Sequence, residues 1–242
     1  MRLSRLIFIL TIFTTWSASA SYDLPKNLSS GDRVRALEIL GFGSASKILD
    51  NPYPLGGYSG IEVGIASEYI PTEDLATLGS ETTDTGEINY LTLTFGKGLY
   101  YNVDTHVYFT PALGDGIQTF GGQVRWGFYE APFFPLTLTA MISGGGANFS
   151  NLINVKTLGA DLIASVAMNN VAIYFGGGRV RAIGTFIGGT DGITDDQNTV
   201  EEDIVENHTV FGINVDIAKF FLALQIDRYA DSVYSGKLGY RF

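Results

Sequence analysis

Hydrophobic residues alternate with polar, glycine or small residues over many short stretches of this chain. Near the carboxyl terminus, Tyr234, Leu238, Tyr240 and Phe242 share one parity, and polar or small residues lie between them. A period of two is typical of strands, because successive side chains of a strand point to opposite faces. The alternation predicts about ten strands, near residues 58–70, 87–97, 101–110, 117–130, 135–147, 156–168, 171–187, 206–216, 219–229 and 232–242.

The connections between these strands differ in length. If the first strand runs outward, the inner turns are short, and the outer connections include long loops at 71–86 and 188–205. Strands of ~9 to 11 residues are long enough to cross a membrane when tilted. Short turns on one side and long loops on the other are typical of membrane barrels. The pattern therefore predicts an all-β fold, an antiparallel transmembrane β-barrel of about ten strands that spans residues 58–242.

The first twenty residues predict a secretory signal peptide. Arg2 and Arg5 precede an apolar run from Leu6 to Trp16, and Ala18 and Ala20 supply a small-residue cleavage site. This order is that of a signal peptide, and the run is too short for a membrane-spanning helix of ~20 residues. After residue 20 no uninterrupted apolar run reaches the ~18 residues of a transmembrane helix. We therefore expect the mature protein to be exported.

Residues 21–57 differ from the strands that follow them. Ser29 and Asp32 indicate a helix start, an apolar side follows, and Gly41 is a suitable end, so a short helix is expected near 31–40. Beyond it the chain is rich in glycine and proline and reads as extended turns. This segment is interpreted as a cap at the inner side, as a plug inside the barrel, or as a periplasmic arm. Occlusion of the barrel is favoured, because the apolar side of the helix needs cover.

Composition supports the membrane reading. Charged residues make up 17% of the chain, below the ~25% of soluble domains. A soluble β-sandwich, the alternative for the same alternation, leaves this low charge content unexplained. The net charge of −10 argues against a nucleic-acid partner, which requires basic patches. There is no cysteine, which excludes disulfides and thiolate metal sites.

The closing strand from Ser232 to Phe242 carries a resemblance to a known group. Its alternating pattern with Leu238, Tyr240 and the terminal Phe242 resembles that of small Gram-negative outer-membrane β-barrel proteins. The position that usually holds glycine in that signal is Lys237 in this chain, and the nearby glycine is Gly236. The aromatic pattern therefore matches better than the strict motif. The resemblance implies a location in the cell outer membrane, contact with the lipid bilayer and lipopolysaccharide, and recognition of Leu238, Tyr240 and Phe242 by the barrel-assembly machinery.

The parity opposite the lipid face carries charges of both signs. Arg179 and Arg181 fall on this inward face only if a glycine bulge at residues 176–178 shifts the alternation by one position. In a barrel of this size the interior is narrow, and buried charges persist when they are partnered. Two readings remain: a filled, stabilising ion-pair network, or a narrow plugged pore for small solutes. The expected lumen-facing network is Glu62, Glu68, Asp104, His106, Arg125, Asp161, Arg179, Arg181, Asp216, Asp227, Lys237 and Arg241.

The sequence gives weaker signals for an enzyme, for surface recognition and for a metal site. His208 beside several acidic residues raises the alternative of a hydrolase at the outer rim, in which His208 is a general base. The long loops at 71–86 and 188–205 raise a second alternative, surface recognition. The acidic stretch 191–203 offers oxygen donors suited to weak binding of a divalent cation. No cofactor motif or nucleophile elbow occurs. The sequence therefore predicts a barrel that is structural or a narrow plugged pore, and not an enzyme.

Overall fold

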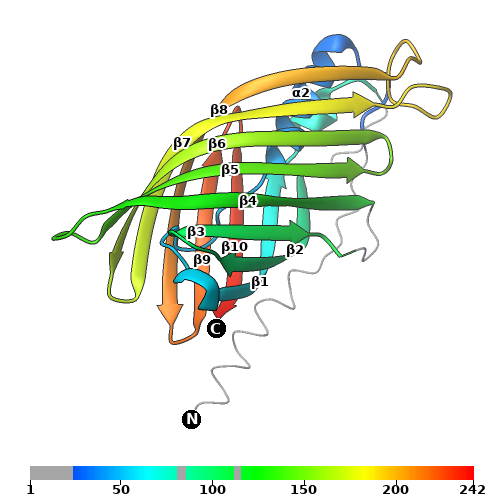
Figure 1. The fold of residues 1–242 in the computed structure, drawn as a ribbon. Coiled ribbons are helices and arrows are strands. Elements are labelled where there is room, and N and C mark those ends of the chain that lie inside the picture. The colour runs from blue at the N-terminus through cyan, green and yellow to red at the C-terminus, as the bar shows by residue number, and fades with distance from the viewer. Residues whose placement is uncertain (1–23, 81–85, 112–115) are drawn as a thin grey trace.

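The computed structural model describes residues 24–80, 86–111 and 116–242. Within them, ten antiparallel strands form a closed barrel in which each strand pairs with its neighbours in sequence and β1 pairs with β10 (Figure 1). The predicted fold class is confirmed. The signal peptide lies outside the described residues. The strands are β1 (Ile61–Pro71), β2 (Glu87–Gly98), β3 (Val103–Phe109), β4 (Ile117–Glu130), β5 (Leu136–Phe149), β6 (Ile153–Met168), β7 (Val171–Phe186), β8 (Val200–Ile217), β9 (Phe220–Arg228) and β10 (Ser232–Arg241).

The two ends of the barrel differ. We call the end with the connections 72–86 and 187–199 the loop end. The opposite turn end carries the tight connections between β6 and β7 and between β8 and β9, together with Phe242. The predicted outer loop at 188–205 is too long, because β8 already begins at Val200. Strands β6, β7 and β8 are the longest, with 16, 16 and 18 residues, and they form a tall wall at the loop end.

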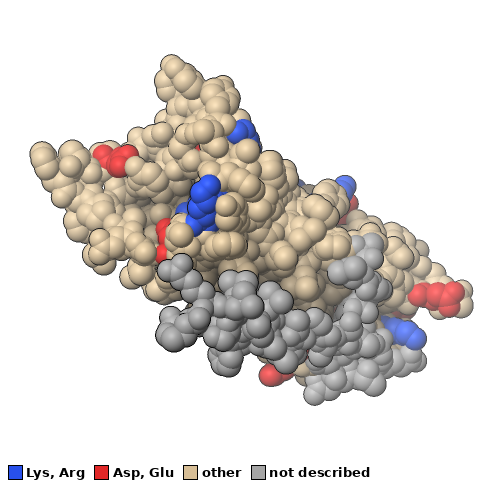
Figure 2. Space-filling view, turned by 90° about the horizontal axis from the view of Figure 1, so that it is seen from below, with Lys and Arg blue, Asp and Glu red and all other residues tan. Residues whose placement is uncertain are grey.

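The outer face of the barrel is apolar. In β9, Leu222, Leu224 and Ile226 are exposed, while Ala223, Gln225 and Asp227 between them are buried inside. Every strand contributes to this apolar band, whose exposed members include Val63, Ile65, Leu91, Leu93, Phe95, Val107, Phe109, Phe120, Val124, Ile142, Leu158, Leu162, Ile173, Phe175, Phe211, Leu222, Leu224, Ile226 and Tyr234. Charged side chains on the face seen in Figure 2 are few and scattered. The faces are thus inverted relative to a soluble protein.

The prediction that Arg179 and Arg181 face the lumen is wrong. Pairing of β6 with β7 runs without a register shift, so the glycines at 176–178 form no bulge, and both arginines are exposed. Val180 and Ala182 point inward instead. The physical reason is that the tall wall extends past the apolar band, so its outer side is solvated and carries charge. A register shift does occur in β4, between Gly127 and Tyr129.

A helix fills the loop end of the barrel. Helix α2 (Ser30–Gly43) begins with a capping box between Ser29 and Asp32, which satisfies free backbone N–H groups of the first turn. Its side chains Leu37, Leu40 and Phe42 are buried, and it lies against β6, β7, β8 and β1. The helix lies at the loop end and not at the end of the short turns, where it was expected, because the apolar residues that cover it are on the tall wall.

The helix also ends later than predicted. Gly41 lies inside the helix and does not end it. A Cβ at this position would lie 2.8 Å from Leu37 Cδ1 and 3.2 Å from Ala182 Cβ. The glycine therefore permits close approach of the helix to β7. In the described part of the chain, no helix is long and apolar enough to cross a membrane.

The chain before β1 passes through the whole barrel. We call residues 24–57 the N-terminal segment. Its start is bridged to both long connections at the loop end, Lys26 to Ser80 and Leu28 to Thr194. Residues 44–50 after α2 are all buried, and the short 3-10 helix η1 (Gly57–Ser59) precedes β1 at the turn end. A second short helix, η2 (Glu73–Thr77), lies in the connection after β1.

The interior is apolar at the loop end and polar in the middle. The largest apolar cluster joins α2, the tall wall and the loop connections, through residues such as Leu28, Leu37, Phe42, Leu75, Phe149, Phe186 and Ile193. Toward the turn end many of the buried inward side chains are polar, and they include Glu62, Asp104, Arg125 and Lys237. The barrel is thus closed by hydrophobic packing at the loop end and by polar contacts between that end and the turn end.

Candidate functional site in the charged interior of the barrel

The wall of the barrel binds the backbone of the N-terminal segment. Gln123 Nε2 donates a hydrogen bond of 2.9 Å to the carbonyl oxygen of Lys47, and Arg125 Nη2 donates one of 2.7 Å to that of Ile48. Gln123 and Arg125 occupy alternate, inward positions of β4, so one strand supplies both donors. An extended segment without secondary structure must satisfy its backbone polar groups by such contacts.

Asp50 is the centre of the first charged cluster. Its side chain is fully buried and forms an ion pair and hydrogen bond with Arg125 through Oδ1. Its other oxygen, Oδ2, lies 3.7 Å from His106 Nδ1 and 4.0 Å from Lys237 Nζ. The segment thus places a carboxylate among basic groups of three different strands.

Glu62 on β1 extends this cluster to the turn end. Lys237 Nζ lies 2.6 Å from Glu62 Oε1, and Arg241 Nε lies 2.9 Å from Glu62 Oε2. Both cations come from β10, which pairs with β1 so that Glu62 stands opposite Arg241. Arg241 also contacts Asp216 at 3.3 Å. The closing pair of strands is therefore held by ion pairs inside the barrel as well as by its backbone ladder.

Asp50, Glu62 and His106 also have the donor types of a metal site. Their donor atoms lie within 4.8 Å of one another, the single such group found among the described residues. The two carboxylates, however, are already neutralised by Arg125, Lys237 and Arg241. A divalent ion would add two buried positive charges beside an ammonium group, which is costly where water is excluded. The cluster is therefore an ion-pair network.

A second charged cluster surrounds His208, closer to the loop end. His208 Nδ1 lies 2.7 Å from Asp161 Oδ1 and His208 Nε2 lies 2.9 Å from Asp227 Oδ1. The histidine side chain is 2% exposed. Its ring is stacked on that of Tyr229, with centroids 4.5 Å apart, and Tyr229 is stacked on Phe42 of α2 at 5.4 Å. This cluster thus reaches the N-terminal segment through aromatic contacts.

Lys47 gives the segment a positive charge on this side. Its Nζ lies 3.8 Å from Glu68 Oε2 on β1 and 5.8 Å from the centroid of the Tyr229 ring. It also donates to the carbonyl oxygens of Gly43 and Ala45. The segment therefore presents a cation to the acidic region around His208 and, three residues later, an anion to the basic region around Arg125.

Most of the expected lumen network lies inside the barrel. The buried inward members are Glu62, Glu68, Asp104, His106, Arg125, Asp161, Asp227 and Lys237. Asp216 and Arg241 lie at the turn end and are partly exposed. Sequence reasoning missed Lys47 and Asp50, because their segment has no strand periodicity, and it missed Gln225, which bonds Asp227 with its amide. The alternation in β9 places Gln225 on the inward face, and this could have identified it from the sequence.

His208 does not lie at an outer rim, as the hydrolase alternative requires. It is buried, and both of its ring nitrogens are occupied by carboxylates, so no nitrogen is free to take a proton from a substrate. The acidic stretch 191–203 is likewise engaged. Arg33 of α2 contacts Asp195 and Glu202 at 3.3 and 2.9 Å, and hydrogen bonds from Asn198 hold the pKa of Asp196 below its ordinary value.

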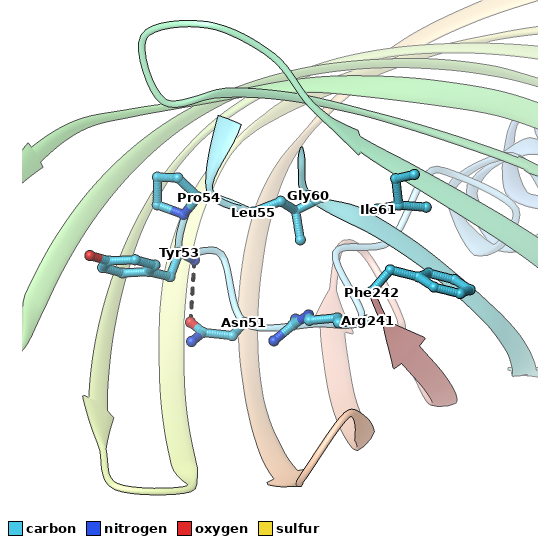
Figure 3. A pocket seen from close by; sticks show the side chains of 8 residues that line it. All are labelled: Asn51, Tyr53, Pro54, Leu55, Gly60, Ile61, Arg241 and Phe242. Carbon is cyan, nitrogen blue, oxygen red and sulfur yellow. Dashed lines mark hydrogen bonds between the residues drawn. The ribbon is translucent and has the colours of Figure 1, made fainter. Parts of the chain in front are cut away.

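The turn end opens into a small pocket of about 120 Å³ beside the end of β10. Figure 3 shows its lining, in which the side chain of Arg241 and the terminal Phe242 lie across from Asn51 and Tyr53 of the N-terminal segment. Tyr53 Oη donates a hydrogen bond of 2.6 Å to Glu130 Oε1, which raises the pKa of the Tyr53 phenol. The segment is thus fastened at this mouth too.

Comparisons with known proteins find structural similarity without sequence similarity. Neither a family model nor a curated protein matches the chain. Among solved structures, the chain is similar to the N-terminal β-barrel domain of Pseudomonas aeruginosa OprF, with 10% identity, a TM-score of 0.40, and coverage of 77% of this chain and 99% of that one. It is also similar to Ail, the attachment invasion locus protein of Yersinia pestis, with 16% identity, a TM-score of 0.30, and coverage of 76% and 97%. For Neisserial surface protein A the identity is 11%, the TM-score 0.29, and the coverage 75% and 94%.

Proposed function

We propose that the chain is an integral outer-membrane β-barrel protein whose lumen is closed by its own N-terminal segment. It acts as a structural barrel, or as a narrow pore that admits small solutes only when that segment leaves. The observation that carries this proposal is the inversion of the two faces: apolar side chains cover the outside, and charged side chains lie within.

The outer face supports the membrane part of the proposal. A soluble monomer rarely exposes an apolar patch larger than a few hundred Å², whereas here the apolar band includes residues of all ten described strands. Exposed aromatic residues gather near the turn end, where Tyr100, Trp126 and Phe128 point outward and Phe133 is fully exposed. Membrane barrels carry such aromatic girdles at the lipid interface.

The interior supports the closed state. Buried residues 44–50 occupy the lumen, α2 fills the loop end, and polar contacts join the N-terminal segment to β4, β9 and β10. A barrel of about eight strands is already filled by its own side chains, and ten strands leave room for little more than one extended segment. Free passage of solutes past the segment is therefore not expected.

Single-channel conductance in a planar bilayer tests the closure. The protein purified from membranes is compared with a variant that lacks residues 24–50, and a heat-modifiable band on gels verifies that each barrel is folded. We expect silence from the whole protein and discrete steps from the folded deletion variant. Steady conductance of the whole protein would overturn the closure, and silence of a folded deletion variant would overturn the interpretation as a pore. The second result would leave the structural role.

The partners follow from the same proposal. The proposal includes export of the protein with cleavage of residues 1–20 and contact of the loop end with lipopolysaccharide. It also includes recognition of Leu238, Tyr240 and Phe242 by the assembly machinery. In support, the side chains of Leu238 and Tyr240 share the outward parity of β10 with exposed Tyr234. Removal of Phe242 is expected to lower the amount of assembled, heat-modifiable protein in cells without preventing refolding in detergent, where no assembly machinery acts.

A further inference from the structure

We propose that Asp161, His208 and Asp227 form a buried proton-binding site that keeps the His208 ring positively charged and fastens the N-terminal segment inside the barrel. Both ring nitrogens of His208 lie at hydrogen-bond distance from a carboxylate oxygen, 2.7 Å from Asp161 and 2.9 Å from Asp227. An ionised carboxylate only accepts hydrogen bonds, so a ring between two of them must carry a proton on each nitrogen.

The hydrogen bonds of Gln225 show that Asp227 is the acceptor. The backbone N–H of Leu49 and the hydroxyl of Tyr174 lie 2.9 and 2.8 Å from Gln225 Oε1. Because the Leu49 N–H can only donate, this atom of Gln225 is the carbonyl oxygen, and Nε2 faces Asp227. Nε2 lies 2.9 Å from both oxygens of Asp227. Asp227 therefore accepts on both oxygens, and His208 Nε2 donates to it.

The second proton belongs between His208 Nδ1 and Asp161. An ordinary histidine is more basic than an ordinary aspartic acid by about 2.6 pKa units, and the carboxylate of Asp227, 2.9 Å from the other ring nitrogen, further favours the charged ring. The shared proton therefore rests on the ring, which makes His208 an imidazolium between two carboxylates. Charge-assisted hydrogen bonds of this kind are about twice as strong as neutral ones.

A glycine creates the space for this contact. Asp161 on β6 stands opposite Gly178 on β7, and Gly178 stands opposite His208 on β8. Asp161 and His208 thus lie two strands apart and meet over the intervening glycine. A Cβ at position 178 would lie 2.6 Å from Asp161 Oδ1. Gly178 is therefore needed for the space that it leaves beside Asp161 and not for a bulge.

The site is joined to the N-terminal segment by two contacts. Tyr229 stacks between His208 and Phe42, and Gln225 binds both Asp227 and the backbone of Leu49. The charged groups facing the site from the surrounding elements are Glu68 on β1 and Lys47 on the segment. Loss of the ring proton would leave three buried carboxylates with one ammonium group, which weakens the hold on Phe42 and Leu49.

Nitrogen-15 NMR of the histidine rings counts these protons. The chain has two histidines, and the variant His106→Asn assigns their signals. In the whole protein at about pH 8, where an ordinary histidine is neutral, we expect two ring N–H signals from His208. A neutral His208 ring with one N–H at that pH would overturn the proposal. This count does not depend on conductance, so it fails separately from the proposed closure of the lumen.

Isosteric variants test the role of each carboxylate. Asp161→Asn and Asp227→Asn are each expected to remove one ring N–H signal at about pH 8, while the solvated Asp203→Asn, on the outer face of the same strand as His208, leaves both. The consequence for the segment, which rests on the proposed closure, is read with Ser46→Cys. Its thiol is the only one in the chain, and we expect Asp161→Asn to speed its labelling by a maleimide at least about tenfold. Unchanged labelling in a variant that has lost the ring proton would overturn the link to the segment.

Discussion

Asp50 and Arg125 form a buried ion pair between the N-terminal segment and β4. The two residues lie 75 positions apart in sequence, and each has an exposed fraction of 3% or less. Arg125 also binds the carbonyl oxygen of Ile48, so one guanidinium holds both a side chain and the backbone of the segment. Arg125 therefore attaches the segment to β4 through two different groups.

Breaking the Asp50–Arg125 pair from one side is expected to destabilise the protein. Arg125→Gln leaves the Asp50 carboxylate buried without its partner, a change that costs about 3 to 5 kcal/mol at comparable sites. Denaturant unfolding, followed by the heat-modifiable band, measures the loss. The double variant Asp50→Asn with Arg125→Gln removes both charges and is expected to be more stable than Arg125→Gln alone. A double variant as unstable as the sum of the two single variants would contradict the ion pair.

The strands could be predicted from the sequence, because their side chains alternate wherever one face meets an apolar environment. The interior was predictable only where that alternation continued, as for Glu62, Asp104 and Arg125. The prediction failed for Arg179 and Arg181 because the two faces of the tall wall differ from those of the rest of the barrel. There the inner face is apolar, since it packs against α2, and the outer face is polar, since it meets water. The alternation alone does not show where the membrane ends.

The rest of the candidate site depends on contacts between distant segments. Asp50 and Lys47 lie in a stretch without periodicity, so their partners on β4 and β1 were invisible in the sequence. His208 was placed at a rim because acidic residues precede it, whereas its partners Asp161 and Asp227 come from other strands. Only the closed barrel brings them together.

The position of the apolar band predicts how the barrel tolerates an added charge. Leu224 is exposed in the middle of the band, on β9, and Val205 is exposed on β8 beyond the band, beside Asp203 and Asn207. In lipid, Leu224→Arg is expected to cost about 2 to 4 kcal/mol, since arginine is unfavourable at the bilayer midplane, and Val205→Arg about 0 to 1 kcal/mol. Unfolding in lipid vesicles measures both. Equal costs for the two variants would place the membrane elsewhere.

The direction of the barrel in the membrane is testable with single cysteines. The native chain has none, so an introduced thiol is the only target of a membrane-impermeant maleimide. Thr190→Cys, on the exposed connection between β7 and β8, is expected to react in intact cells. Asn170→Cys, in the exposed turn between β6 and β7, is expected to react only after the outer membrane is permeabilised. The reverse pattern would mean that the loop end faces the periplasm.

Glycines inside the wall make room for aromatic rings on neighbouring strands. A Cβ at Gly212 would collide with the ring of Tyr174, whereas one at Gly144, on the outer face of β5, would lie no closer than 3.6 Å to another residue. Gly212→Val is therefore expected to destabilise the barrel by about 1 to 3 kcal/mol through overpacking, and Gly144→Val to have little effect. Tyr174 also donates to Gln225, so displacing its ring disturbs the carbonyl oxygen that binds Leu49. Gly212→Val should accordingly increase labelling of Ser46→Cys, and Gly144→Val should not. Equal tolerance of valine at both positions would show that Tyr174 can move without loosening the N-terminal segment.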